Sequence, residues 1–215
     1  DNMVMATGAT GLTVRRCVLE DCRFGVRAHS GDSYDFYIAD NVFRGPVKKW
    51  HPRSESGGNT NHAVWLAGQG HVVCHNRIHD WWDGIDIIGG PQAEQERQNA
   101  AMDFYGNDIT RCGDDAIELD HGMHNIRVFR NRIYDVFMGI SMQPLYGGPG
   151  YVFRNVVYNC TRSPLKPNVQ PAGVQVFHNT LVSAGAAANF ADGWSSSRML
   201  NNLFIGYGGE CVLGT

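Results

Sequence analysis

The stretch Val-Phe-Arg-Asn-Arg-Ile at residues 128–133 indicates how the chain folds, because the same pattern returns at a fixed distance. It reappears as Val-Phe-Arg-Asn-Val-Val at residues 152–157 and as Val-Phe-His-Asn-Thr-Leu at residues 176–181, each time 24 residues further on. A constant spacing of this kind is typical of repeat architectures, in which each repeat packs only on its neighbours. The pattern therefore predicts a stack of similar units.

The pattern extends over nearly the whole chain. It consists of two or three apolar residues, an asparagine, one variable residue and a further apolar residue, with Cys17 at the asparagine position of the first unit. Successive marks are 24, 35, 31, 24, 24, 24 and 23 residues apart, which predicts about eight coils. The asparagines of the later coils are Asn41, Asn76, Asn107, Asn131, Asn155, Asn179 and Asn202.

The short apolar segments predict strands. A 24-residue unit interrupted by Gly and Asn leaves no room for two helices of 3.6-residue periodicity, and propellers and sandwiches have longer or irregular periods. We expect the asparagine to adopt the left-handed conformation between two strands, while its amide bonds to the asparagine one coil above. The sequence therefore predicts an all-β fold, a right-handed parallel β-helix with three short parallel sheets whose coils lie roughly 4.8 Å apart.

The length of 215 residues favours a single domain, residues 1–215, over two. The two longer coils carry extra sequence, rich in Gly, Gln, Ser and Pro, at residues 45–61 and 89–101. We expect these to be loops that border a binding site. Neither end of the sequence resembles a polar cap, so we expect a segment of a longer solenoid.

Composition narrows the possible functions. With 18 Lys and Arg against 21 Asp and Glu, the net charge is −3, which gives no basic field for nucleic acid. No apolar run approaches the roughly 18 residues of a membrane span. Cys22, Cys112 and Cys160 each fall five residues after a coil's mark, so we expect a stack of reduced core side chains.

Polar residues follow one face of the expected helix. After each mark the chain enters a strand of the form Gly or Ala, apolar, variable, apolar, and the period of two places the variable residues outward. This outward row consists of Arg27, Trp65, Asp86, Glu118, Ser141 and Lys166. The turn before the strand adds His62, Asp83 and Asp115, with Asp114 beside them, and Asp120 and Gln143 lie two residues further along the strand.

This arrangement brings acidic side chains of adjacent coils within a few ångströms. Such carboxylates repel one another unless a proton, a cation or a substrate offsets the charge. Asp83 and Asp114 could simply cap their turns. Asp86 and Glu118, however, project from strand centres, where turn formation gives no reason for an acid. The set therefore indicates a functional site.

Two motifs on this face are similar to those of polygalacturonase-type glycoside hydrolases, within a whole-length resemblance to the pectate-lyase-like β-helix superfamily. Residues 82–86, Trp-Asp-Gly-Ile-Asp, resemble the family's Asn-Thr-Asp-Gly-Ile-Asp, and residues 113–117, Gly-Asp-Asp-Ala-Ile, resemble its Gly-Asp-Asp-Cys-Ile. Trp82 and Met138 depart from the family's Thr and His.

By this resemblance Asp83, Asp114 and Asp115 would supply the acid and the water-activating base of an inverting hydrolysis without a cofactor, supported by Asp86 and Glu118. The substrate would be a polysaccharide, and the resemblance implies a secreted or periplasmic protein.

Two other functions remain open. In β-helical polysaccharide lyases, which this face also resembles, Asp86, Glu118 and Asp120 would hold Ca²⁺ while Lys166 or an Arg removes the α-proton of a uronate. Alternatively, the solenoid belongs to a non-catalytic carbohydrate-binding protein, adhesin or fibre.

Sugar rings stack on flat aromatic side chains. Trp50 and Tyr146 are expected beside the polar face. The residues expected to contact the polysaccharide directly are His62, Trp65, Trp81, Trp82, Asp86, His121, Ser141 and Gln143.

Overall fold

A computed structural model describes residues 1–46, 61–87, 99–190, 192–208 and 211–214. Most of the two expected loops, 45–61 and 89–101, and Trp50 with them, fall outside these ranges, so their part in binding stays a prediction. Within the described ranges no helix is long and apolar enough to cross a membrane.

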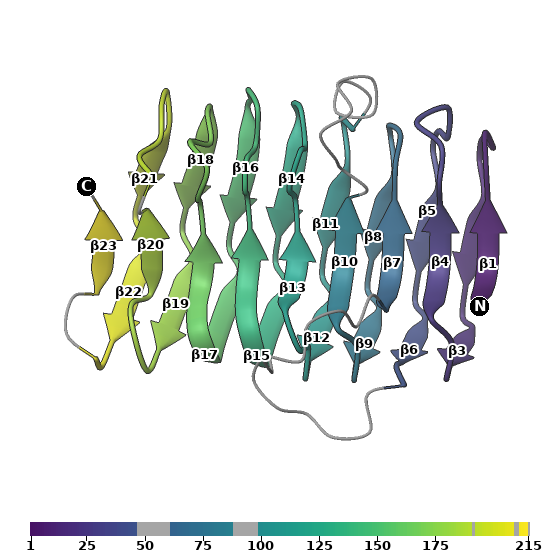
Figure 1. Ribbon diagram of the computed structural model, residues 1–215, viewed down its shortest axis with the longest axis horizontal. Coiled ribbons are helices and arrows are strands. Elements are labelled where there is room, and N and C mark those ends of the chain that lie inside the picture. The colour runs from purple at the N-terminus through teal and green to yellow at the C-terminus, as the bar shows by residue number, and fades with distance from the viewer. Residues whose placement is uncertain (47–60, 88–98, 191, 209–210, 215) are drawn as a thin grey trace.

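The chain winds as a parallel β-helix, with its coils following one another along the long axis (Figure 1). One row of strands faces the viewer in Figure 1, and each strand pairs with the equivalent strand of the next coil. This first row begins with β1 (Asn2–Ala6), β4 (Phe24–Ala28), β7 (His62–Leu66), β10 (Asp83–Ile87) and β13 (Asp115–Glu118).

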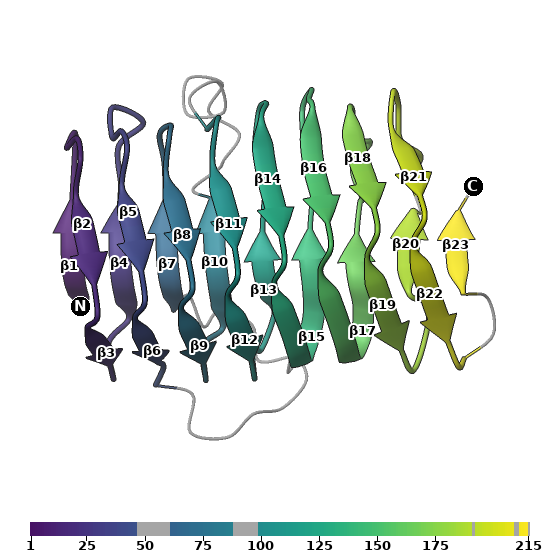
Figure 2. The same cartoon turned by 180° about the vertical axis from the view of Figure 1, so that it is seen from behind.

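A second row forms a separate sheet on the opposite side (Figure 2). It has eight strands in the described chain, one for each coil, in agreement with the predicted number, and about seven turns connect them. The strands are β2 (Thr13–Arg15), β5 (Tyr37–Ala39), β8 (Val72–Cys74), β11 (Asp103–Tyr105), β14 (Ile126–Phe129), β16 (Gly150–Phe153), β18 (Val174–Phe177) and β21 (Arg198–Leu200).

The third row is not a separate sheet, contrary to the expectation of three. Two long strands, β15 (Arg132–Ser141) and β17 (Val156–Lys166), run through the third row and into the first, so the two rows merge into one 13-stranded sheet. A two-stranded sheet, β20 (Ala188–Phe190) with β23 (Val212–Gly214), completes the fold. The other third-row strands are β3 (Val18–Glu20), β6 (Val42–Arg44), β9 (Arg77–His79), β12 (Asp108–Thr110), β19 (Thr180–Ser183) and β22 (Leu203–Gly206).

The core consists of apolar side chains stacked from coil to coil. Each one buried contributes roughly 1.5–3 kcal/mol relative to exposure. All six cysteines are free, and the three expected in the core are buried there. The inward positions of the first row, each fully buried and paired with the next, are Val26, Val64, Ile85, Ile117, Ile140 and Leu165.

The asparagines form the predicted ladder inside the helix. The Oδ1 atom of Asn131 accepts hydrogen bonds from the backbone N (3.0 Å) and the Nδ2 (3.1 Å) of Asn107. Its own Nδ2 donates to the carbonyl of Phe104 (2.9 Å) and to Oδ1 of Asn155 (3.0 Å). Because Asn131 is 2% exposed, these bonds replace water completely.

The expected conformation of the asparagine itself is wrong. The residue with positive φ is the one before it, as in Asp40 (58°), His75 (57°) and Arg130 (55°). The preceding residue makes the sharp turn, which leaves the asparagine side chain directed inward, where it bonds to the neighbouring coils.

Candidate active site

The first row places the outward residues side by side in the predicted order. Arg27 pairs with Trp65, Trp65 with Asp86, and Asp86 with Glu118. Glu118 then pairs with Ser141, and Ser141 with Lys166. The first residues of the strands, which the sequence had placed in the preceding turn, give a parallel row in which Phe24 pairs with His62 and His62 with Asp83. Sequence spacing alone therefore identified the lateral neighbours of this face.

Gly84 lets the acidic coils approach closely. A Cβ atom on Gly84 would lie 2.4 Å from the carbonyl oxygen of Ala116 in the next coil, so a larger residue would force β10 and β13 apart. With glycine present, the backbone N–H of Asp115 donates to Oδ1 of Asp83 at 3.0 Å. Asp83 is 5% and Asp115 2% exposed, so this contact lies beneath the surface.

A buried ion pair crosses two coils. Nζ of Lys166 lies 2.7 Å from Oδ2 of Asp115. Burial alone would lower the pKa of Lys166, but the charges of Asp115 and Asp120 outweigh burial, and the net pKa is raised. Lys166 is therefore a cation at neutral pH, held by a carboxylate, and is poorly suited to be the proton-abstracting base of a lyase.

The neighbouring carboxyl groups hold their protons unusually strongly. Burial, together with the charge of Asp120, raises the pKa of Glu118 to about 8. Burial also raises the pKa of Asp115 to about 7, even against the opposing effect of Lys166. The pKa values of Asp83 and Asp86 are raised well above 3.8 by burial and then by the charge of Glu118. The groups therefore titrate as a coupled set, with protons retained near neutral pH.

Asp120, two residues after the end of β13, is hydrogen-bonded to the next coil beside these carboxyl groups. Its Oδ1 accepts hydrogen bonds from Oγ of Ser141 and from the backbone N of Gln143, both at 2.6 Å. Burial raises the pKa of Asp120 to about 6, while the bond from Ser141 opposes the rise. Asp120 consequently loses its proton before Glu118 does as the pH increases.

His62 is a neutral imidazole beside two of the acids. Its Nδ1 lies 3.0 Å from Oδ2 of Asp86 and 3.4 Å from Oδ2 of Asp83, without hydrogen-bond alignment. Burial, and then the charges of Arg23 and Arg27, lower the pKa of His62 to about 3. At neutral pH the ring therefore adds no positive charge to the acidic cluster.

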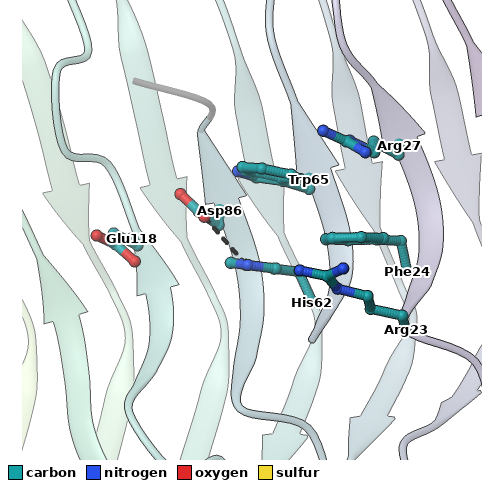
Figure 3. A pocket seen from close by; sticks show the side chains of 7 residues that line it. All are labelled: Arg23, Phe24, Arg27, His62, Trp65, Asp86 and Glu118. Carbon is teal, nitrogen blue, oxygen red and sulfur yellow. Dashed lines mark ion pairs between the residues drawn. The ribbon is translucent and has the colours of Figure 1, made fainter. Parts of the chain in front are cut away.

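A groove runs over this face. Two hollows, of about 490 and 230 Å³, share Trp65, Asp86 and Glu118 as lining residues. Figure 3 shows the larger hollow, with the two carboxyl groups on one side and Arg27 with the aromatic rings on the other. The smaller hollow continues past Asp120 to His121 and Gln143. Together they make a path along the solenoid axis.

Aromatic rings form one wall of the larger hollow. The rings of His62 and Trp65 stack at 4.8 Å, and those of Phe24 and Trp65 at 5.1 Å. The guanidinium of Arg27 lies over Trp65, 4.4 Å from the ring centre. This wall places apolar aromatic side chains next to the carboxyl groups, a surface against which a sugar ring can pack.

The predicted site residues fall into separate groups. Asp83, Asp115 and Lys166 lie beneath the groove as a buried network, and Asp83, Asp114 and Asp115 come together as predicted. Several of the predicted residues border the groove: His62, Trp65, Asp86, Glu118, Asp120, His121 and Gln143. For these residues the roles in binding and catalysis stay predictions.

Two predicted substrate contacts are wrong. Trp81 is fully buried in the apolar core, because its side chain points inward. Ser141 is also fully buried and donates to Asp120, so it positions a carboxyl group instead of facing solvent. Trp82 is half-buried over Gly113, where a Cβ would lie 2.8 Å from the indole ring.

Sequence reasoning missed part of the groove. Arg23, Phe24 and Arg27 line the larger hollow but were not assigned a role. Arg27 already stood in the predicted outward row, and Phe24 occupies the frame position of His62 one coil earlier. Continuing both rows toward the N-terminus would have found Phe24 and Arg27, whereas Arg23, one residue before Phe24, lies in neither row.

Metal-ligand groupings differ from the predicted one. Among the described residues, two sets of three have ligand atoms within 4.8 Å of one another: His62 with Asp83 and Asp86, and Asp83 with Asp114 and Asp115. Asp86, Glu118 and Asp120 do not form such a set there. Asp115 is already paired with Lys166. Calcium therefore stays a prediction of the lyase alternative.

Comparisons with known proteins address the fold. Neither the curated proteins nor the solved structures contain a match to this chain. The family model described as "Right handed beta helix region" matches residues 2–204, which cover nearly the whole sequence and all of the groove residues. The chain belongs to the right-handed β-helix family.

Proposed function

We propose that the chain hydrolyses glycosidic bonds of a polysaccharide lying along the groove. The observation that carries this proposal is the position of Asp86 and Glu118, which are neighbours on adjacent strands and line both hollows beside the ring of Trp65. Two carboxyl groups at one sugar-sized aromatic surface are what acid and base catalysis of this reaction needs.

Glu118 is the proton donor in this proposal. Its pKa of about 8 keeps it protonated at neutral pH, and it is more exposed than Asp86. As the glycosidic C–O bond breaks, Glu118 gives its proton to the leaving oxygen. Asp86 takes a proton from the water that attacks the anomeric carbon, so this step requires Asp86 to be ionised although burial and the charge of Glu118 raise its pKa. The coupled pair supplies this state when it holds a single proton.

The buried residues below Asp86 and Glu118 influence how many protons this pair holds. Asp83 and Asp115 lie below it, and Lys166 provides the only positive charge in contact with a carboxylate among the described cluster residues. In this proposal the catalytic residues are Asp86 and Glu118, which line the groove. They replace Asp83, Asp114 and Asp115, to which the sequence resemblance assigned that role. This assignment also favours hydrolysis over an elimination in which Lys166 is the base, because Lys166 is occupied by its ion pair.

The test uses purified protein on a panel of neutral, uronic-acid and sulfated polysaccharides. Glu118→Gln and Asp86→Asn are each expected to lower kcat/KM for reducing-end release by roughly 10²- to 10⁴-fold. Asp103→Asn, which removes a carboxylate paired with Arg127 on the second row, is the matched control and keeps full activity.

The pH profile gives a second readout. Activity is expected to fall above pH of about 8, as Glu118 loses its proton. An unsaturated product absorbing in the near ultraviolet, abolished by a chelator, would establish the lyase instead. Lack of any cleavage across the panel would contradict both enzymatic functions.

A further inference from the structure

The larger hollow has opposite charges at its two ends. Asp86 and Glu118 lie at one end, and Arg23 and Arg27 at the other, with Trp65 between (Figure 3). Arg27 is two coils from Asp86, a separation of about 10 Å along the axis. The cationic end is thus about a disaccharide away from the carboxyl pair and belongs to the same groove.

Two aromatic rings lie close to the guanidinium of Arg27. Its guanidinium lies 4.4 Å from the ring centre of Trp65 and 4.7 Å from that of Phe24. A guanidinium near two aromatic rings gains cation–π stabilisation, and its N–H groups can still bind an anion. The contacts therefore confine the cation to this end of the hollow.

The donors of Arg27 are incompletely used. One Nη atom is 3.0 Å from Nδ1 of His29, but Nε is buried and has no hydrogen-bond partner. No carboxylate among the described residues forms an ion pair with Arg27. A buried N–H without an acceptor costs free energy. Because Nε is out of contact with solvent, an anion at the hollow would compensate the positive charge of the guanidinium without bonding to Nε itself.

A second cation lies beside this one. Arg23 lies over the ring of Phe24 at 5.1 Å, so Phe24 is contacted by both guanidinium groups. Burial, and then the charge of Arg23, lower the pKa of Arg27, which indicates repulsion between them. An anion bound at the hollow would relieve this repulsion.

We propose that the Arg27 end of the groove is a subsite for a negatively charged substituent, a carboxylate or a sulfate, on a sugar unit of the bound glycan. This inference rests on the proposed function for the presence of a glycan in the groove. It adds a requirement that the acidic end does not impose, namely that the substrate carries a negative charge about two coils from the cleaved bond. Arg27, beside the ring of Trp65, would bind that charge.

The test measures binding without cleavage, so it is independent of catalysis. The dissociation constants of a uronan, a sulfated galactan and a neutral glucan are measured by calorimetry with the Glu118→Gln protein. The anionic glycans are expected to bind at least tenfold more tightly than the glucan. Arg27→Gln in this background removes that preference, with a loss of about 10- to 100-fold for the anionic glycans alone.

Two controls distinguish binding at a specific subsite from a general effect of the protein's positive charge. Arg198→Gln removes an equal charge from an exposed position on β21 and leaves the dissociation constants unchanged. Arg27→Lys keeps the charge but not the planar fork, so it retains only part of the affinity. Circular dichroism checks that each variant is folded. The stronger of the two anionic ligands identifies carboxylate or sulfate as the substituent.

The proposal is overturned if anionic glycans bind no better than the neutral one, or if Arg27→Gln and Arg198→Gln have equal effects. Binding that depends on Arg27 in a protein whose wild type cleaves nothing would instead refute the hydrolase and retain the subsite.

Discussion

The molecule contains two stacked rows of polar side chains that repeat from coil to coil, one inside and one outside. In the inner row, every amide of the asparagine ladder donates and accepts bonds at about 3 Å to neighbouring coils. In the outer row, Asp86, Glu118 and Asp115 are also neighbours, but their charges repel, and only Asp115 is paired with a cation.

The difference shows what each row contributes. A neutral amide can donate to one neighbour while it accepts from the other, so stacking it satisfies every buried group. An ionised carboxylate can only accept, so stacking it costs free energy unless protons or ligands intervene. The inner row therefore stabilises the coil, and the outer row stores an unfavourable arrangement of the kind found at functional sites.

Breaking the inner row should have the largest effect on stability. Asn131→Ala removes four hydrogen bonds and leaves buried partners in Asn107 and Asn155 without theirs. We expect a loss of about 3–5 kcal/mol in the free energy of unfolding, measured by urea denaturation. Asn202→Ala, at a partly exposed ladder position, should cost about 1 kcal/mol because water can replace the lost bonds. Equal losses would contradict the importance of burial.

Removing the cation that is paired with the buried Asp115 should have the next largest effect. Lys166→Met leaves the buried carboxyl of Asp115 without its partner, which should cost about 3 kcal/mol at pH 8. The cost should shrink at pH 5, where Asp115, with a pKa already about 7, takes up a proton. Adding Asp115→Asn should restore most of the loss at pH 8. If it does not, the lysine stabilises through packing and not through charge.

Removing an acid from the outer row should stabilise the protein. The pKa of Glu118 is about 8 in the folded state and ordinarily 4.5, so the native state binds the extra proton between these values, and wild-type stability falls as pH rises through them. Glu118→Gln should therefore raise the free energy of unfolding by about 1–3 kcal/mol at pH 8 and change it little at pH 4. Thermal denaturation at both pH values measures this. A loss of stability at pH 8 would show that the carboxylate is satisfied.

Sequence periodicity predicted the parts of the molecule that repeat. It gave the coils, the ladder, and the lateral order of Arg27, Trp65, Asp86 and Glu118, because a parallel stack converts spacing directly into neighbours. It could not predict how deeply each side chain is buried. Trp81 and Trp82 are adjacent in sequence, yet one fills the core and the other covers Gly113, since the inward or outward direction changes at the turn between them and the strand.

Contacts that span several coils could not be predicted from the sequence either. Lys166 reaches Asp115 by spanning Ser141 and Met138, which depends on side-chain length and on the course of β15 and β17. The merging of the first and third rows could not be predicted either. Residues 135–138, which join the two rows, continue as strand where earlier coils turn.

The ladder has a consequence for how the chain can vary. The hydrogen bond from the backbone N of one asparagine to Oδ1 of the next is 3.0 Å long, whether the two asparagines are 35, 31 or 24 residues apart. Each asparagine thus restores the register, and an insertion in one coil is not transmitted to the following one. The number of residues between two ladder positions can therefore change while the spacing of the groove strands is kept, which makes the solenoid a modular platform for altered specificity.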